Sequence, residues 1–127
     1  MHKIPIVEKK RYILANLAGM SSKQEIAETG KRARSIAFRR KKPLVLDFRN
    51  AELDFDHEDV LQFFNQYYES SEQLLKFVYV AHWFNRDSPY LREIDQEWLD
   101  KGISTCPFSE ARDIIRWINE LEIMHKL

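Results

Sequence analysis

Apolar residues occur in short runs separated by charged or turn-forming residues, and these runs predict strands. The range 44–48 is almost wholly apolar and ends in charge, and the range 77–83 is a second run of this kind. Such runs are typical of parallel strands that are covered on both faces, so we predict that both are central. Shorter runs predict three further strands, at 4–8, 12–18 and 103–106. Pro5 places the first of these at an edge of the sheet.

Apolar residues at helical spacing predict four helices between and after these strands. The first begins at Ser22-Lys23-Gln24-Glu25, which fits a capping box, and it ends before Pro43. The second begins within 54–59 and the third at Ser88-Pro89. We predict that Ser109 caps the last helix. Its inward residues are predicted to be Ala111, Ile114, Ile115, Ile118 and Leu121.

The order of elements is therefore β-β-α-β-α-β-α-β-α. Repeated βα units favour right-handed crossovers and a parallel sheet. We expect one α/β domain over residues 1–127, with a mostly parallel sheet of about five strands and an antiparallel N-terminal edge strand.

Several local patterns appear in an order that resembles a known family. A predicted hairpin ends in Leu17-Ala18-Gly19 and a capped helix follows; next come Val45-Leu46-Asp47-Phe48-Arg49 and a final helix with Phe108, Ala111 and Ile115-x-Trp117-Ile118. This arrangement resembles the SpoIIAA-like group of the STAS fold (sulfate transporter and anti-sigma-factor antagonist). The resemblance implies a bacterial regulatory module that binds a partner through its second helix and is not an enzyme. Related bacterial proteins are also compared with lipid-binding domains, which keeps a small apolar ligand open.

The resembled family carries a phosphorylated serine at the start of its second helix, about nine residues after the Val-Leu-Asp strand. That count leads to Asp56 in this chain, and the range 53–59 holds no serine, threonine or tyrosine. A carboxylate carries less charge and fewer oxygens than a phosphate. We therefore expect this segment to be fixed rather than switched.

The basic residues are concentrated in the first part of the chain. Residues 1–50 hold 13 Lys/Arg and four Asp/Glu, whereas residues 51–127 hold seven and 16. The chain as a whole is neutral, which disfavours nucleic acid as a partner. Cations cluster at 31–42, and a candidate basic patch is Arg39, Arg40, Lys41 and Lys42. It is either a contact for an anionic partner, such as anionic lipid or an acidic protein, or a solvated helix end that the helix dipole favours.

Three other features of the sequence carry candidate chemistry. Asp54, Asp56, His57 and neighbouring acids suit either a divalent cation or the N-terminus of a helix, and we favour the helix and expect no metal or other cofactor. His82 lies in an apolar run and is predicted to be a core histidine or a polar group at the edge of a strand rather than a catalytic base for Cys106. Cys106, the only cysteine, is predicted to pack rather than to act as a nucleophile.

The predicted second helix has more apolar residues than one face can bury. Phe63 and Phe64 are about 100° apart around a helix, so Phe63 or Tyr67 is expected at a protein-partner or self-association surface, together with Asp54 and His57. A homodimer is one such association. The first functional hypothesis is a non-catalytic regulatory interaction module; the alternative is a protein that binds a small apolar ligand or lipid.

The cellular location follows from what the sequence lacks. The N-terminal residues show no apolar run typical of a signal peptide, and no stretch reaches the roughly 18 apolar residues of a membrane span. A single cysteine allows no internal disulfide. We therefore expect a cytoplasmic protein that is not transmembrane.

Overall fold

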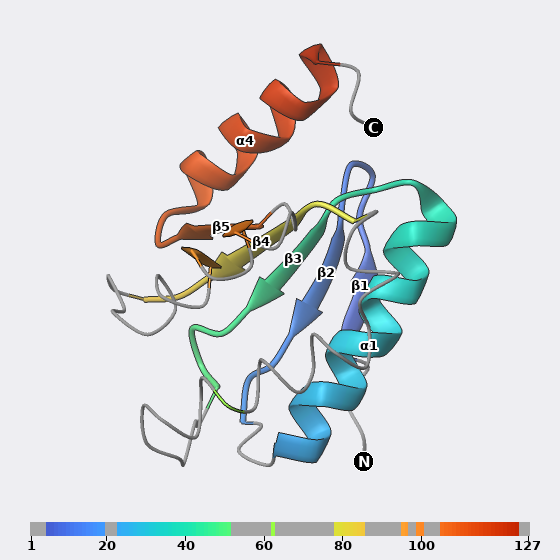
Figure 1. Ribbon diagram of the computed structural model, residues 1–127, viewed down its shortest axis with the longest axis vertical. Helices are drawn as coiled ribbons and strands as arrows, with labels where there is room; N and C mark the ends of the chain where they lie inside the picture. The colour runs from blue at the N-terminus through green and yellow to red at the C-terminus, as the bar shows by residue number, and fades with distance from the viewer. Residues whose placement is uncertain are drawn as a thin grey trace.

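Five strands form one mixed sheet in the computed structural model (Figure 1), in the order β1-β2-β3-β4-β5. The structure describes residues 5–19, 23–51, 62, 78–85, 95–96, 99–100 and 105–124. The strands are β1 (Ile6–Glu8), β2 (Ile13–Asn16), β3 (Leu44–Asp47), β4 (Val80–Trp83) and β5 (Thr105–Phe108). β1 pairs antiparallel with β2, and all other pairs are parallel. The predicted α/β class and antiparallel N-terminal edge strand are confirmed.

The two long apolar runs form the centre of the sheet, as predicted. β3 lies between β2 and β4, and all of its residues are buried. β4 lies between β3 and β5, and only Trp83 in it is partly exposed. Each of these strands needs apolar side chains on both faces because both faces are covered.

The helices α1 (Lys23–Arg40) and α4 (Ala111–Ile123) pack on opposite faces of the sheet. Ala33 of α1 belongs to the core cluster that contains Leu44 and Leu46, whereas Ile118 of α4 belongs to the cluster that contains Val45. Successive strand residues point to opposite faces, so this alternation separates the two clusters. Figure 1 shows α1 beside the β1 end of the sheet and α4 beside the β5 end. The two middle helices of the prediction fall largely outside the described residues.

The C-terminal prediction needs three corrections. The last strand was predicted at 103–106, but β5 extends to Phe108 and includes Pro107, which an edge strand tolerates. Glu110 rather than Ser109 is the N-cap residue of α4, and it makes no side-chain capping hydrogen bond. Ala111 and Ile115 are exposed, not inward.

The reason lies in the helical spacing. The buried residues Ile114, Ile118 and Leu121 form one stripe at intervals of four and three residues. Ile115 lies about 100° from Ile114 around the helix, and its side chain therefore leaves that stripe. In the described part of the chain, no helix is long and apolar enough to cross a membrane.

Candidate anion-binding site

The predicted basic patch lies at the end of α1 and in the turn that leads to β3. Lys41 has a φ of 56°, in the left-handed region. Its N–H donates to the Phe38 carbonyl, and the Lys42 N–H donates to the Ala37 carbonyl, at 3.3 and 3.1 Å. This pair of bonds is the Schellman arrangement that closes a helix. Arg39 and Arg40 therefore lie in the last turn of α1, and Lys41 and Lys42 lie in the turn that follows it.

Glu8 of β1 holds one end of the patch in place. Its Oε2 lies 2.8 Å from the Lys42 Nζ, and its Oε1 lies 3.5 Å from the Arg40 Nε. The Lys42 ammonium also donates to the Lys9 carbonyl at 2.8 Å. The hydrogen bond from Lys42 and the nearby charge of Arg40 lower the pKa of Glu8. Two of the four patch cations are therefore tied to the edge strand.

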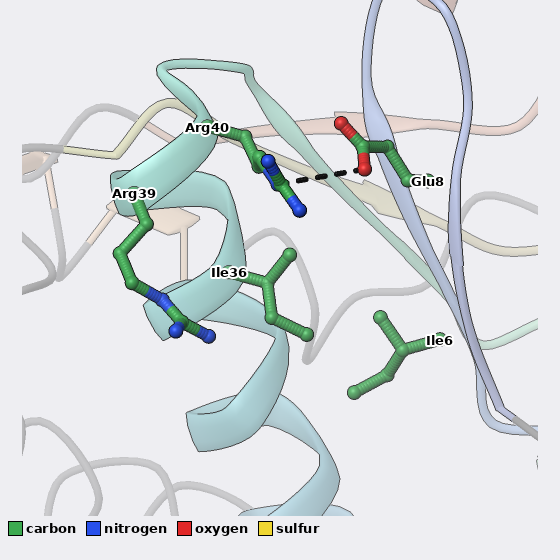
Figure 2. A pocket seen from close by; sticks show the side chains of 5 residues that line it. All are labelled: Ile6, Glu8, Ile36, Arg39 and Arg40. Carbon is green, nitrogen blue, oxygen red and sulfur yellow. Dashed lines mark ion pairs between the residues drawn. The ribbon is translucent and has the colours of Figure 1, made fainter.

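A pocket opens between these elements. Its volume is about 480 Å³, and its lining residues are Ile6 and Glu8 from β1 with Ile36, Arg39 and Arg40 from α1. Figure 2 shows Ile36 and Arg40 of α1 opposite Ile6 and Glu8 of β1, with Arg40 paired to Glu8, and the Arg39 side chain running along the helix. We call this site the α1/β1 pocket. Ligand sites are commonly about 300–1,000 Å³ in volume, so its size suits a ligand or a few side chains of a partner.

Arg39 is the lining cation that no described acid neutralises. It is exposed, and within the described part of the chain it forms no ion pair. Arg40 is exposed too but already faces Glu8. The lining thus combines two isoleucine side chains with two guanidinium groups and one carboxylate. This composition suits a group that is anionic at one end and apolar beside it.

The basic segment as a whole is not a solvated face. Lys31 and Arg32 are exposed, but Arg34 is almost completely buried. Its position between Ala33 and Ala37 of the core stripe explains this burial, because it lies three residues from Ala37 on the same side of the helix. The cation run therefore consists of one buried arginine and several more accessible cations, two of which line the pocket.

A second polar cluster surrounds His82, which is completely buried. Its Nδ1 lies 2.8 Å from Asp95 Oδ1 and 3.0 Å from Thr105 Oγ1, and the threonine hydroxyl also donates to Asp95 Oδ1. The ring packs against Phe48 with centroids 5.8 Å apart. The predicted core histidine is confirmed. The cluster joins β4, β5 and the helical residue Asp95 in the buried interior.

A third cluster lies at the carboxyl ends of β3 and β4, where α/β proteins usually bind ligands. The Arg49 Nε and Nη2 donate to the two oxygens of Asp47, and the guanidinium stacks on Trp83. The Asn85 amide donates to the Arg49 carbonyl. The Arg49 guanidinium is already bonded to Asp47 and stacked on Trp83. This cluster is therefore a weaker candidate for binding an anion than the α1/β1 pocket.

Cys106 directly follows Thr105 of the His82 cluster in the sequence. Its side chain points to the α4 side of the sheet, because Cys106 pairs with Ala81, which belongs to the core cluster on that side. Burial, and then the negative charges of Asp95 and Glu120, raise the pKa of its thiol. A raised pKa keeps the sulfur protonated at neutral pH, and the thiol is a poor nucleophile in that form.

The other predicted site residues, Asp54, Asp56, His57, Phe63 and Tyr67, lie outside the described residues. The predictions made for them stay predictions. Among the residues that are described, no group of three or more His, Cys, Asp or Glu side chains is placed to hold a metal ion.

Sequence reasoning missed Ile6, Glu8 and Ile36 as partners of the basic patch. Glu8 is the first acidic residue in a strongly basic N-terminal half, and this isolation is the signal that could have pointed to it. Its distance in sequence from the patch hid the contact, which depends on β1 and α1 lying side by side. No protein-family model, curated protein or solved structure matches the chain.

Proposed function

We propose that this protein is a non-catalytic regulatory interaction module that binds an anionic segment of a partner protein in the α1/β1 pocket. The observation that carries the proposal is Arg39, an exposed guanidinium in a lining that also holds two isoleucines, with no ion pair to an acid among the described residues. Glu8 pairs with Arg40, and a bound carboxylate would pair with Arg39 in the same way. Charge-assisted hydrogen bonds of this kind are stronger than neutral ones.

The pocket's chemistry argues for binding rather than catalysis. The described side chains that line it supply no imidazole, thiol or hydroxyl group. Glu8 is the one carboxylate in the lining, and Lys42 lowers its pKa. A carboxylate with a lowered pKa is a weak proton acceptor, and its ion pairs leave it little freedom to act as a general base.

A second candidate function is the binding of a small anionic amphiphile, such as the headgroup end of an anionic lipid. The two isoleucines and the volume of about 480 Å³ favour it. A wholly apolar ligand fits less well, because three of the five lining residues are charged and desolvating them without partners is costly.

The test is a titration of the full chain with three probes. They are an N-acetylated, C-amidated peptide that alternates glutamate and valine, the same peptide with lysine in place of glutamate, and vesicles of phosphatidylserine in phosphatidylcholine. We expect the acidic peptide to bind and to shift the methyl resonances of Ile6 and Ile36, and the lysine peptide not to bind. Binding to the vesicles alone would instead support the lipid alternative.

Three variants locate the binding. Arg39→Gln should weaken the acidic peptide about threefold to tenfold, because one charge-assisted contact is lost. Arg116→Gln, an exposed arginine on α4, is the matched control and should leave the affinity unchanged. Glu8→Gln should strengthen binding, since it releases Arg40 and Lys42 for the ligand. Equal affinity in all three variants would overturn the proposal.

A further inference from the structure

The edge strand β1 turns part of its backbone away from the sheet. Asn16 N–H donates to the Pro5 carbonyl at 2.7 Å, and Lys9 N–H donates to the Tyr12 carbonyl at 2.8 Å. Every second residue of an antiparallel strand points its N–H and C=O to the same neighbour. Pro5, Val7 and Lys9 therefore face β2 with their backbone groups.

Ile6 and Glu8 alternate with these residues, so their N–H and C=O groups point to the opposite edge. β1 is the first strand in the sheet order, and no described strand lies beyond it. These two residues also line the α1/β1 pocket with their side chains. Among the described residues, the unpaired backbone edge and the pocket thus belong to the same two residues.

An extended chain laid along this edge would lie about 4.8 Å from β1. Its side chains would alternate between the two faces of the enlarged sheet. Those on the α1 face would point toward Ile36, Arg39 and Arg40, which line the far wall of the pocket (Figure 2). Strand addition of this kind supplies affinity through the backbone and selectivity through pockets for alternate side chains.

The charges around the β1 edge indicate which kind of partner segment could pair with it. Arg39 and Lys41 are exposed at the end of α1, and Lys9 and Lys10 are exposed in the turn after β1. Glu8 is the acid of the pocket lining and is already paired. An incoming segment with acidic side chains at alternate positions would neutralise the remaining cations.

A second copy of this chain does not match the edge. Two β1 strands paired about a two-fold axis at Val7 would place Ile6 opposite the copy's Glu8 and bring two basic α1 ends together. Each pocket lining contributes two arginines and one glutamate, so the shared space would hold an excess of positive charge. Pro5 and the two lysines that follow β1 also limit pairing to a short stretch, as is common in protected edges.

We propose that the α1/β1 pocket recognises an extended, acidic peptide segment of a partner protein, which adds as a strand to the free edge of β1. The backbone of Ile6 and Glu8 pairs with the segment, and alternate acidic side chains enter the pocket and meet Arg39. This inference rests on the proposed function and specifies how the partner is held.

The test uses backbone N-methylation of the peptide that alternates glutamate and valine. One variant carries methyl groups on the glutamate amides and the other carries the same number on the valine amides. If the peptide adds as a strand, only one of the two sets donates to β1. We expect that set to lose at least about tenfold in affinity, whereas the other set stays within about twofold.

Amide hydrogen exchange supplies an independent readout on β1 itself. The amides of Ile6 and Glu8 should exchange at least about tenfold more slowly in the complex. The amide of Val7 already faces β2 and is the internal control, which should change little. Arg39→Gln should lower the affinity for the peptide whether or not the peptide adds as a strand. This variant therefore tests whether the peptide lies in the pocket.

The outcomes separate the two proposals. If both methylated peptides bind like the parent and the Ile6 and Glu8 amides gain no protection, strand addition is wrong while the anionic site stands. If the unmethylated acidic peptide does not bind, or binds Arg39→Gln equally well, the proposed function fails as well.

Discussion

The guanidinium of Arg49 lies on the indole of Trp83, with its central carbon 3.4 Å from the ring centroid. The same side chain donates two hydrogen bonds to the carboxylate of Asp47, which raises the pKa of Arg49. Residues from the ends of two neighbouring parallel strands are thereby joined. Stacking and fork-shaped bonding both depend on a planar guanidinium, which lysine does not have.

Arg49→Lys should therefore destabilise the protein by about 1–2 kcal/mol, from the lost bidentate bond and the lost stacking. Urea denaturation at neutral pH measures this change. Arg116→Lys is the control, because Arg116 is exposed and its nearest acid, Asp113, is 3.9 Å away. Equal stability of the two variants would show that the stacked pair contributes little.

Lys41→Gly should stabilise the protein, although it removes a side chain. Lys41 has a φ of 56°, a conformation that costs a non-glycine residue about 1–2 kcal/mol and glycine almost nothing. Glycine loses more chain entropy on folding, so the net gain should be about 0.5–1 kcal/mol.

Lys31→Gly, within α1, is the matched control and should destabilise by about 1 kcal/mol. Thermal and urea unfolding of both variants measure whether each substitution stabilises or destabilises the protein. A loss of stability in Lys41→Gly would show that the lysine side chain itself contributes to the turn.

Thr105→Val tests the buried cluster around His82. The substitution keeps the volume but removes a hydroxyl that lies 3.0 Å from His82 Nδ1 and donates to Asp95. Buried polar groups that lose a partner cost about 1–3 kcal/mol, and we expect a loss in that range. Thr105→Ser keeps the hydroxyl and should cost about 1 kcal/mol, from the missing methyl group alone. Urea denaturation that finds the serine variant less stable than the valine variant would contradict the hydrogen-bonded arrangement.

The lowered pKa of Glu8 predicts a contribution to acid sensitivity. The folded protein favours the ionised carboxylate, so this stabilisation is present above the unfolded pKa of Glu8. It is lost as the pH falls below the ordinary value of 4.5 and through the folded value. Glu8→Gln should therefore lower the Tm at pH 7 by about 2 °C or less, because the pair is exposed, and the difference should vanish near pH 3.

Salt provides the control for that effect. At about 1 M salt the Debye length falls to about 3 Å, so the difference between Glu8→Gln and the unchanged protein at pH 7 should shrink. A difference in Tm that persists unchanged at pH 3 or at high salt would mean that Glu8 stabilises the fold by packing rather than by charge.

Local patterns in the chain are enough to predict the α/β class, the two central strands and the long helix after the hairpin. The buried run of β3 and the spacing of Ile26, Ala33 and Ala37 in α1 express local periodicity, which a single chain carries in full. Pro5 marked the edge strand for a similar reason, because its ring removes a backbone donor whatever surrounds it.

The candidate site, in contrast, depends on contacts between residues that are far apart in the sequence. The sequence shows a run of cations, but whether each is solvated, buried or paired depends on residues far along the chain. Arg34 became a core residue, Lys42 was paired by Glu8, and Arg39 lies in the pocket lining with no ion pair among the described residues. The α1/β1 pocket exists because a parallel crossover returns α1 to the side of a strand some 30 residues earlier. That juxtaposition is a property of the sheet, and no local pattern contains it.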